Sequence, residues 1–350
     1  MDIQMASART RAAGAALCIA IAFGIAACTG GGGSTSAVPH GPTPAPTAPP
    51  GSAGSVTEYV LTTSNAEPYG LTSGPDGNIW FLEMITGKAG KITPAGGVTE
   101  YPLPSSGLQL TAISAGPDGK LWYTSINTSQ VGNIATSGAT SPLFTLTGAQ
   151  LVQFITTGPD GNLWVGAAGF IAKITTSGAI TKYTFKSKNG DEPGVMGLAA
   201  GADGNVWFAD NAGFVGKITP SGTVTEYAIP TALSQPWGVA EGPDGNIWFT
   251  ETATSKIGKV TPSGAVTEYA LTVPKSIQSD GPEGIVAGPD GNMWFTEYYA
   301  NRIGRITTSG TITEYGIPTP NAGAAFIALG SDGNLWFDEF NAVQIGKITP

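Results

Sequence analysis

The sequence predicts an all-β protein, a seven-bladed β-propeller with four antiparallel strands in each blade. Gly and Pro account for 51 and 26 of the 350 residues, and residues so costly inside helices argue against helical bundles and coiled coils. A unit of G-P-D-G-N-I-W-F-x-E, K-I-G-K-I-T-P and S-G-x-V-T-E-Y recurs every 41–46 residues. Its seven copies are marked by Trp80, Trp122, Trp164, Trp207, Trp248, Trp294 and Trp336. Four strands in a unit of about 42 residues are typical of propeller blades.

Each copy contains four short β-prone runs separated by turn signals. In the first copy we expect strands at residues 69–73, 78–83, 89–93 and 98–101. Asp76-Gly77 predicts a tight hairpin between the first two, because glycine readily adopts the positive φ that such turns need. Ile79, Trp80 and Phe81 are apolar on both faces of their strand, which predicts that neighbouring blades cover both faces.

The two ends of the chain predict how the ring closes. The seventh copy stops at Ile348-Thr349-Pro350, before an outer strand of its own. The missing V-T-E-Y segment stands at the other end of the chain, within residues 54–59. We therefore expect the N-terminal strand to complete the last blade, so that the ring has no open edge.

Charge and cysteine content exclude several kinds of partner and site. Lys and Arg number 16 against 25 Asp and Glu, for a net charge of −9, and a chain without a basic cluster is not expected to bind nucleic acid. Both cysteines, Cys18 and Cys28, lie within the first 28 residues, so the propeller has no disulfide or cysteine-held metal. We expect the propeller, which spans residues 54–350, to be a monomer.

The N-terminal segment predicts export. Residues 1–27 combine Arg9 and Arg11 with an apolar run that ends in small residues, as export signals do, and the run is short for a transmembrane helix. Ile25-Ala26-Ala27-Cys28 resembles a bacterial lipobox, so we expect lipidation of Cys28. An ordinary signal peptide with a chance cysteine is the alternative.

Residues 28–53 are rich in Gly, Ser and Pro and predict a tether between the membrane and the propeller. The one histidine of the chain, His40, lies in this tether and is not expected to be a ligand or a catalyst. The predicted location is the cell envelope, at the outer membrane or the cell surface, with the lipid anchor as the membrane contact.

One aspartate in the turn before each tryptophan recurs with the scaffold. Because each belongs to a different blade and a turn aspartate usually bonds its own backbone, we interpret these residues as structural rather than as calcium ligands. They are Asp76, Asp118, Asp160, Asp203, Asp244, Asp290 and Asp332.

The innermost strands of a propeller line a central channel, where we expect a ligand. One inner position varies from copy to copy while the scaffold repeats, as expected of a site built on a frame. It holds Tyr69, Thr111, Gln153, Met196, Trp237, Glu283 and Ala325. Fourteen residues later stand Glu83, Ser125, Ala167, Asp210, Glu251, Glu297 and Glu339.

From these positions we select Gln153, Trp237, Glu283 and Glu297 as candidate ligand-binding residues of the channel. The flat faces of Tyr69 and Trp237 favour a cyclic or sugar ligand, although further packing is an equal alternative for Trp237. The five carboxylates of the second set, if gathered at one mouth, would favour a cation or raise one another's pKa. The alternative is that each is a solvated charge at the rim.

The first blade combines two carboxylates with a phenol. Glu67-Pro68-Tyr69 precedes Glu83 on the same predicted blade, and oxygen ligands of this kind suit Mg²⁺ or Ca²⁺. Tyr69 is a poor base at an ordinary pKa of about 10, but it could ionise beside a metal.

The repeat G-P-D-G-N-I-W-F-T-E, K-I-G-K-I-T-P-S-G-x-V-T-E-Y resembles the virginiamycin B lyase (streptogramin lyase) family of seven-bladed propellers over residues 54–350. The resemblance implies an enzyme that opens a cyclic depsipeptide antibiotic by elimination at its ester. It also implies a Glu-Pro-His-Gly segment with one metal ligand and the catalytic histidine, a second ligand from the next Trp-Phe-x-Glu, and a substrate-binding histidine from the preceding blade.

The implied active site is largely missing here. In chain order the catalytic segment falls on Gly323-Ala324-Ala325-Phe326, where only the second metal ligand, Glu339, remains, and the substrate histidine falls on Glu283. The nearest surviving copy is in the first blade, with Tyr69 in place of histidine.

Two functions therefore stand out. One is a non-catalytic, envelope-anchored module that binds a small cyclic or glycan ligand, or an envelope protein. The alternative is a Mg²⁺-assisted carbon–oxygen lyase that uses Glu67, Glu83 and Tyr69; a purely structural envelope role is a third hypothesis. Mg²⁺ or Ca²⁺ is the expected cofactor if there is one.

Overall fold

A computed structural model describes residues 52–105, 107–272 and 281–350 of the chain. The predicted signal peptide, Cys28 and His40 lie outside the described residues. Within the part described, the regular secondary structure consists of strands, and no segment forms a helix long and apolar enough to cross a membrane.

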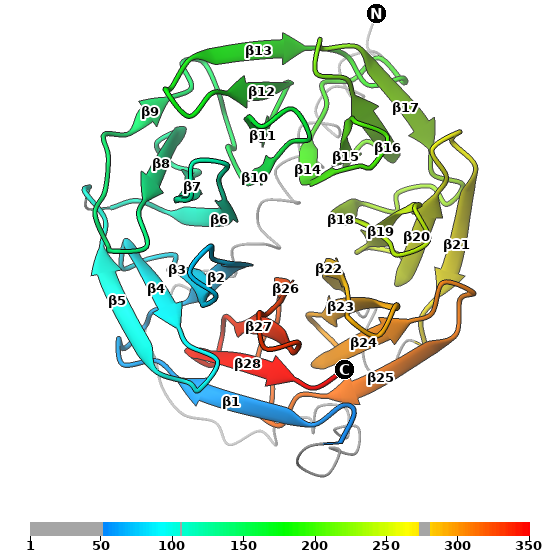
Figure 1. Cartoon of the computed structure of the whole chain (residues 1–350). Helices are drawn as coiled ribbons and strands as arrows, with labels where there is room; N and C mark the ends of the chain where they lie inside the picture. The colour runs from blue at the N-terminus through cyan, green and yellow to red at the C-terminus, as the bar shows by residue number, and fades with distance from the viewer. Residues whose placement is uncertain (1–51, 106, 273–280) are drawn as a thin grey trace, which may run out of the picture. The chain divides into compact units, whose positions relative to one another are not determined.

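The strands form seven sheets of four antiparallel strands, arranged as blades around a central axis (Figure 1). This confirms the predicted seven-bladed propeller. In blades 1 to 6 the chain runs from the innermost strand to the outermost one, and the first residues of each innermost strand lie at one end of the channel, which we call the mouth.

The strand bounds follow the repeat closely. Blades 1 and 2 consist of β2 (Pro68–Ser73), β3 (Ile79–Glu83), β4 (Lys88–Ile92), β5 (Val98–Pro102), β6 (Leu110–Ala115), β7 (Leu121–Ser125), β8 (Gln130–Ile134) and β9 (Phe144–Thr145). Blades 3 and 4 consist of β10 (Phe154–Thr157), β11 (Leu163–Ala167), β12 (Phe170–Ile174), β13 (Ile180–Thr184), β14 (Val195–Ala200), β15 (Val206–Asp210), β16 (Phe214–Ile218) and β17 (Val224–Ala228). Blades 5 and 6 consist of β18 (Pro236–Glu241), β19 (Ile247–Glu251), β20 (Lys256–Val260), β21 (Val266–Ala270), β22 (Pro282–Ala287), β23 (Met293–Glu297), β24 (Arg302–Ile306) and β25 (Ile312–Gly316). Blade 7 consists of β26 (Ile327–Leu329), β27 (Leu335–Glu339), β28 (Gln344–Ile348) and β1 (Val56–Val60).

The N-terminal strand closes the ring, as the sequence predicts. β1 pairs with β28 from Val56 opposite Ile348 to Val60 opposite Gln344, so the two ends of the chain share one sheet in blade 7. Tyr59 stacks on Trp336 with ring centroids 5.5 Å apart. The closing strand therefore supplies both the outer edge of blade 7 and an aromatic partner for its tryptophan.

The turn aspartate fixes the tryptophan of its own blade. In every blade the indole N–H donates to the aspartate Oδ1 over 2.9–3.1 Å. The same oxygen also accepts the backbone N–H two residues on in all seven blades, as with Asp76 and Asn78. Burial opposes ionisation of Asp76, but hydrogen bonds from Asn78 and Trp80 and the charge of Lys91 outweigh it and lower its pKa. The predicted bonding of these residues to their own turns is confirmed.

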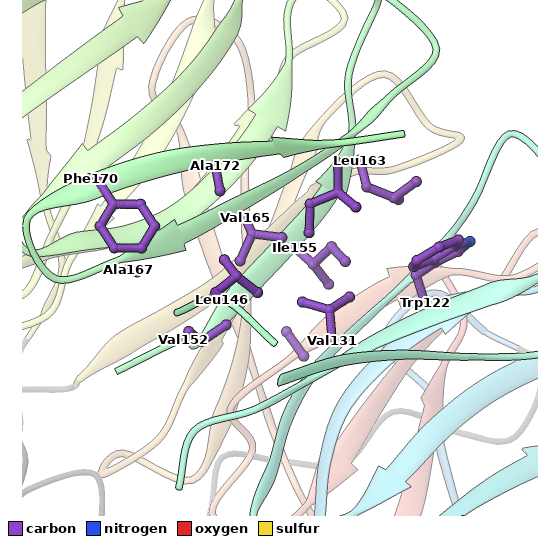
Figure 2. Packing of buried hydrophobic residues seen from close by; sticks show 12 residues of the cluster. Trp122, Val131, Leu146, Val152, Ile155, Leu163, Val165, Ala167, Phe170 and Ala172 are labelled. Carbon is purple, nitrogen blue, oxygen red and sulfur yellow. The ribbon is translucent and has the colours of Figure 1, made fainter. Parts of the chain in front are cut away.

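Apolar side chains fill the space between neighbouring blades. Figure 2 shows the contact between blades 2 and 3, where Trp122 and Val131 face Ile155, Leu163 and Val165. All seven scaffold tryptophans are at most 1% exposed, which confirms that both faces of the second strand are covered.

The closing strand gives the first testable prediction. Deleting residues 54–60 would expose the edge of β28 and leave Trp336 without Tyr59, so we expect the melting temperature to fall by at least about 10 °C, as a loss of several kcal/mol would produce in a domain of this size. Deleting residues 41–47 of the tether, a segment of equal length, is the matched control and should change little. An unchanged melting temperature in the first variant would disprove closure by this strand.

Candidate functional site

The backbone at the mouth differs between blades because of a β-bulge. The first pair of strands shifts register in blades 1, 2, 4, 5 and 6 but not in blades 3 and 7. A Cβ at Gly197, Gly238 or Gly284 in the bulged blades would lie within 2.2–2.7 Å of a carbonyl oxygen of the next blade. The equivalent residues of the two unbulged blades are Phe154 and Phe326, so a large side chain stands here only where the bulge is missing.

These two phenylalanines help to fill the channel with aromatic rings. Trp237 meets Phe154 and Phe326 edge-on, each with a centroid distance of 4.9 Å. Tyr69 also contacts Phe326, at 4.9 Å, and Phe340, at 5.7 Å. Trp237 is only 8% exposed, so packing accounts for most of its surface. The rings of Phe154, Trp237 and Phe326 border an axial cavity of about 140 Å³ whose other walls are glycine backbone and aliphatic side chains.

Asp338 accepts three backbone N–H groups from two segments beside this cluster. Its Oδ1 accepts the N–H groups of Ala325 and Phe326, each over 2.8 Å, and its Oδ2 accepts the N–H of Gly70 in blade 1 over 3.0 Å. Threonine occupies this position in three other blades; there Thr250, for example, accepts from Gly238 N and donates to Glu283 O. Burial raises the pKa of Asp338 to about 7, although the backbone donors oppose the shift.

Polar groups from blades 1, 6 and 7 meet at the mouth. Burial and then the charges of Glu283 and Asp338 raise the pKa of Tyr69 well above its usual value. Burial, followed by Glu283, also raises the pKa of Tyr298 to about 12. The Asn341 amide lies 3.5 Å from the Tyr298 hydroxyl. The phenols of Tyr69 and Tyr298 and the carboxyl group of Glu283, from blades 1 and 6, thus share one electrostatic environment next to Phe326 and Phe340 of blade 7.

Glu283 is the charged centre of this group. Its pKa is raised well above the usual range by burial and, secondarily, by Asp338. Glu283 also raises the pKa of Tyr299, after burial. Among the described residues, no lysine or arginine contributes to the shift in the pKa of Glu283. The mouth is therefore acidic and aromatic.

Neither Glu67 nor Glu83 is among the charged groups that raise the pKa of Tyr69. Glu83 is fully buried, and its Oε2 accepts a hydrogen bond from the hydroxyl of Thr86. Burial comes first in raising its pKa, and the nearby charges that act on it are Glu100 and Lys88 of the outer strands rather than groups of the channel. Glu67 has a positive φ of 45° and a carbonyl that accepts from Met84 N over 3.1 Å; burial raises its pKa.

The five carboxylates that end the second strands form no common cluster and do not reach solvent. Glu83, Asp210, Glu251, Glu297 and Glu339 are all fully buried, which corrects the expectation of solvated rim charges. Among the described residues, no group of three or more acidic, histidine or cysteine side chains could hold a metal ion. Glu297 lies opposite Pro282 of the innermost strand on one side and opposite Arg302 of the third strand on the other. Gln153 is partly exposed just before β10, and its carbonyl accepts from the Thr124 hydroxyl over 3.2 Å.

Sequence reasoning missed Phe154, Phe326, Asp338, Tyr298 and Asn341. Two signals were present in the repeat: a phenylalanine at a position that is glycine in four other copies, and an aspartate at a position of Trp-Phe-Thr-Glu that is threonine elsewhere. Tyr298 and Asn341 lie just after the second strands of blades 6 and 7, in segments whose sequences differ from copy to copy, and the repeat gave no signal for them.

Known proteins resemble this chain in sequence and in structure. A model of the Virginiamycin B lyase family matches residues 51–190 and 147–350. A virginiamycin B lyase from Staphylococcus aureus is 33% identical with a TM-score of 0.78, over 84% of this chain and 99% of that one. A streptogramin B lyase structure is 32% identical with a TM-score of 0.77, over 84% and 97% of the two chains.

A third structure is a catalytically inactive histidine-to-alanine variant of the Staphylococcus aureus virginiamycin B lyase with quinupristin. It is 34% identical with a TM-score of 0.77, over 84% of this chain and 99% of that one. A comparison with curated proteins found no match. The family match covers nearly the whole propeller, and on that basis the chain belongs to the virginiamycin B lyase family.

Proposed function

We propose that this protein is an envelope-anchored, ligand-binding propeller of the virginiamycin B lyase family that does not catalyse the lyase reaction. One observation carries the proposal: residues 54–350 contain no histidine. A solved relative is described as catalytically inactive once a single histidine is replaced by alanine. A propeller without histidine has no imidazole of its own to move a proton near neutral pH.

The mouth offers what a small cyclic or glycan ligand needs. Tyr69 and Phe340 present ring surface, while the Tyr298 hydroxyl, the Asn341 amide and the Glu283 carboxyl offer hydrogen bonds of different kinds. A site of ring faces with a few convergent polar groups suits an amphipathic ring or a sugar. An envelope protein could present an amphipathic group of the same kind to the mouth.

The alternative lyase function rests on Glu67-Pro68-Tyr69-Gly70 in blade 1, which keeps three of four residues of the segment that the resemblance implies. Glu67 and Glu83 would hold Mg²⁺, which would polarise a substrate carbonyl; Glu83 Oε1 is a buried acceptor without a hydrogen-bond partner among the described residues. Tyr69 would have to serve as the base. Burial and then the charges of Glu283 and Asp338 raise the pKa of Tyr69 when no metal ion is bound, so the phenolate that a base requires would depend on the bound ion.

The lyase hypothesis can be tested directly. We expect the full chain to leave quinupristin intact, with or without Mg²⁺, when products are analysed by liquid chromatography and mass spectrometry. The family enzyme from Staphylococcus aureus serves as the positive control. A ring-opened product of unchanged mass, lost in Tyr69→Phe, would overturn the non-catalytic proposal.

Ligand binding makes a second prediction. Calorimetric titration with quinupristin and with a panel of envelope oligosaccharides should find one saturable binding event per chain. Glu283→Gln and Tyr69→Ala should weaken that event roughly tenfold or more, since each removes a group that lines the mouth. Asp118→Asn is the control, because Asp118 lies in the turn after the innermost strand of blade 2, at the end of that strand away from the mouth. This variant should bind the ligand as the parent protein does. Failure of every probe to bind would contradict the proposal.

The envelope anchor is tested separately. We expect the full chain to fractionate with membranes after expression in a bacterium that processes lipoproteins, and Cys28→Ser to release it to the soluble fraction. Cys18→Ser, in the apolar run, is the matched control and should remain membrane-bound. Equal membrane association of all three forms would rule out lipidation of Cys28.

A further inference from the structure

Three blades repeat one arrangement of charges across their outer strands. A buried glutamate ends the second strand, a cation begins the third strand opposite it, and a second glutamate lies on the outermost strand. The cation pairs with the outer glutamate at 2.9 Å in blade 1 (Lys88–Glu100), 3.3 Å in blade 5 (Lys256–Glu268) and 2.6 Å in blade 6 (Arg302–Glu314). The buried glutamates are Glu83, Glu251 and Glu297.

Blade 7 keeps both glutamates but has no cation between them. Gln344 begins the third strand, opposite Glu339 on one side and Val60 of the closing strand on the other. Glu58, on β1, occupies the outer position, opposite Gly346. A Cβ on Gly346 would lie 2.8 Å from Glu339 Oε1, so the Glu339 carboxyl group extends across β28 toward Glu58.

Three acceptor atoms of this group lack a donor. Glu339 is fully buried, and neither of its carboxyl oxygens nor Gln344 Oε1 has a hydrogen-bond partner among the described residues. Glu58 Oε1 accepts the backbone N–H of Thr319 over 2.8 Å. Glu58 and Asp338 are the charged groups that act on Glu339, and no cation of the described residues is among them.

Buried acceptors that converge without a donor are costly unless something positive joins them. A proton on Glu339 would satisfy one of the three oxygens. A divalent cation would neutralise both carboxylates and could be coordinated by all three oxygens. Carboxylate and amide oxygens are ligands that Ca²⁺ and Mg²⁺ prefer. Blade 7 thus keeps two glutamates without the cation that pairs with the outer one in blades 1, 5 and 6, and its charge and chemistry match such an ion.

We propose that Glu339, Gln344 and Glu58 form a divalent-cation site that replaces the lysine or arginine of the other blades. The site joins β27 and β28 to the closing strand, so the ion stabilises the closed ring. It differs from the metal pair that the family resemblance implies, whose other ligand would stand at Gly323, and it does not depend on ligand binding at the mouth.

The test uses the full chain, first stripped with EDTA and then given Ca²⁺, Mg²⁺ or, as a monovalent control, K⁺. We expect millimolar Ca²⁺ or Mg²⁺ to raise the melting temperature by several degrees and calorimetry to find one ion per chain. Gln344→Lys should raise the melting temperature of the EDTA-treated protein and abolish the response to the ions. Lys88→Gln is the matched variant, because it creates the same arrangement in blade 1 and should lower stability until an ion is added.

Two results would overturn the proposal. One is a parent protein whose stability does not change with any of the ions, which would leave a protonated Glu339 as the occupant. The other is an ion response that survives in Gln344→Lys, which would place the ion elsewhere. Gln344→Leu guards against misreading a folding defect, because it removes the amide ligand without adding charge and should fold but bind the ion more weakly.

Discussion

The packing of one tryptophan per blade is the interaction on which the rest of the structure depends. The turn aspartate fixes the indole, and an aromatic ring of the outermost strand stacks on it with centroids 5.5–5.9 Å apart in all seven blades. That outer ring also covers a glycine in the hairpin of the next blade, as Tyr101 covers Gly138. Lys91 completes the unit, since its ammonium lies over Trp80 and donates to Thr136 O of blade 2. Each blade is thus held to the next by the residues that repeat.

Because those residues repeat, the sequence predicted the blade number, the strands and the closing strand. The candidate site was predicted less well, since a period places backbone positions but not the directions of side chains. Glu83 and Glu339 were expected near the channel, yet their charges face Glu100 and Glu58 of the outermost strands. Trp237 was placed at the channel, but the rings of Phe154 and Phe326 that enclose it come from blades 3 and 7. Contacts between blades depend on shape, which periodicity does not report.

Departures from the repeat concentrate in blade 7. Phe326 stands where most blades have glycine, Asp338 where three have threonine, and Gln344 where three have lysine or arginine. Two of these residues act on the mouth, and the third lies beside the closing strand. Blade 7 is also the blade built from both ends of the chain. Its sheet therefore combines the closure of the ring with part of the mouth.

The same departures bear on catalysis through the backbone. Where the family segment implies a glycine, Phe326 is incompatible with the bulge that glycine permits in the other blades, and blade 7 has no bulge. The position of the catalytic histidine falls on Ala325, which is fully buried with its N–H donated to Asp338. A histidine placed there would meet Asp338 and the aromatic cluster rather than the mouth. Blade 1 keeps both the bulge and Gly70, so its Tyr69 still reaches the channel. Blade 7 thus differs from the segment that the resemblance implies in its backbone geometry as well as in its missing imidazole.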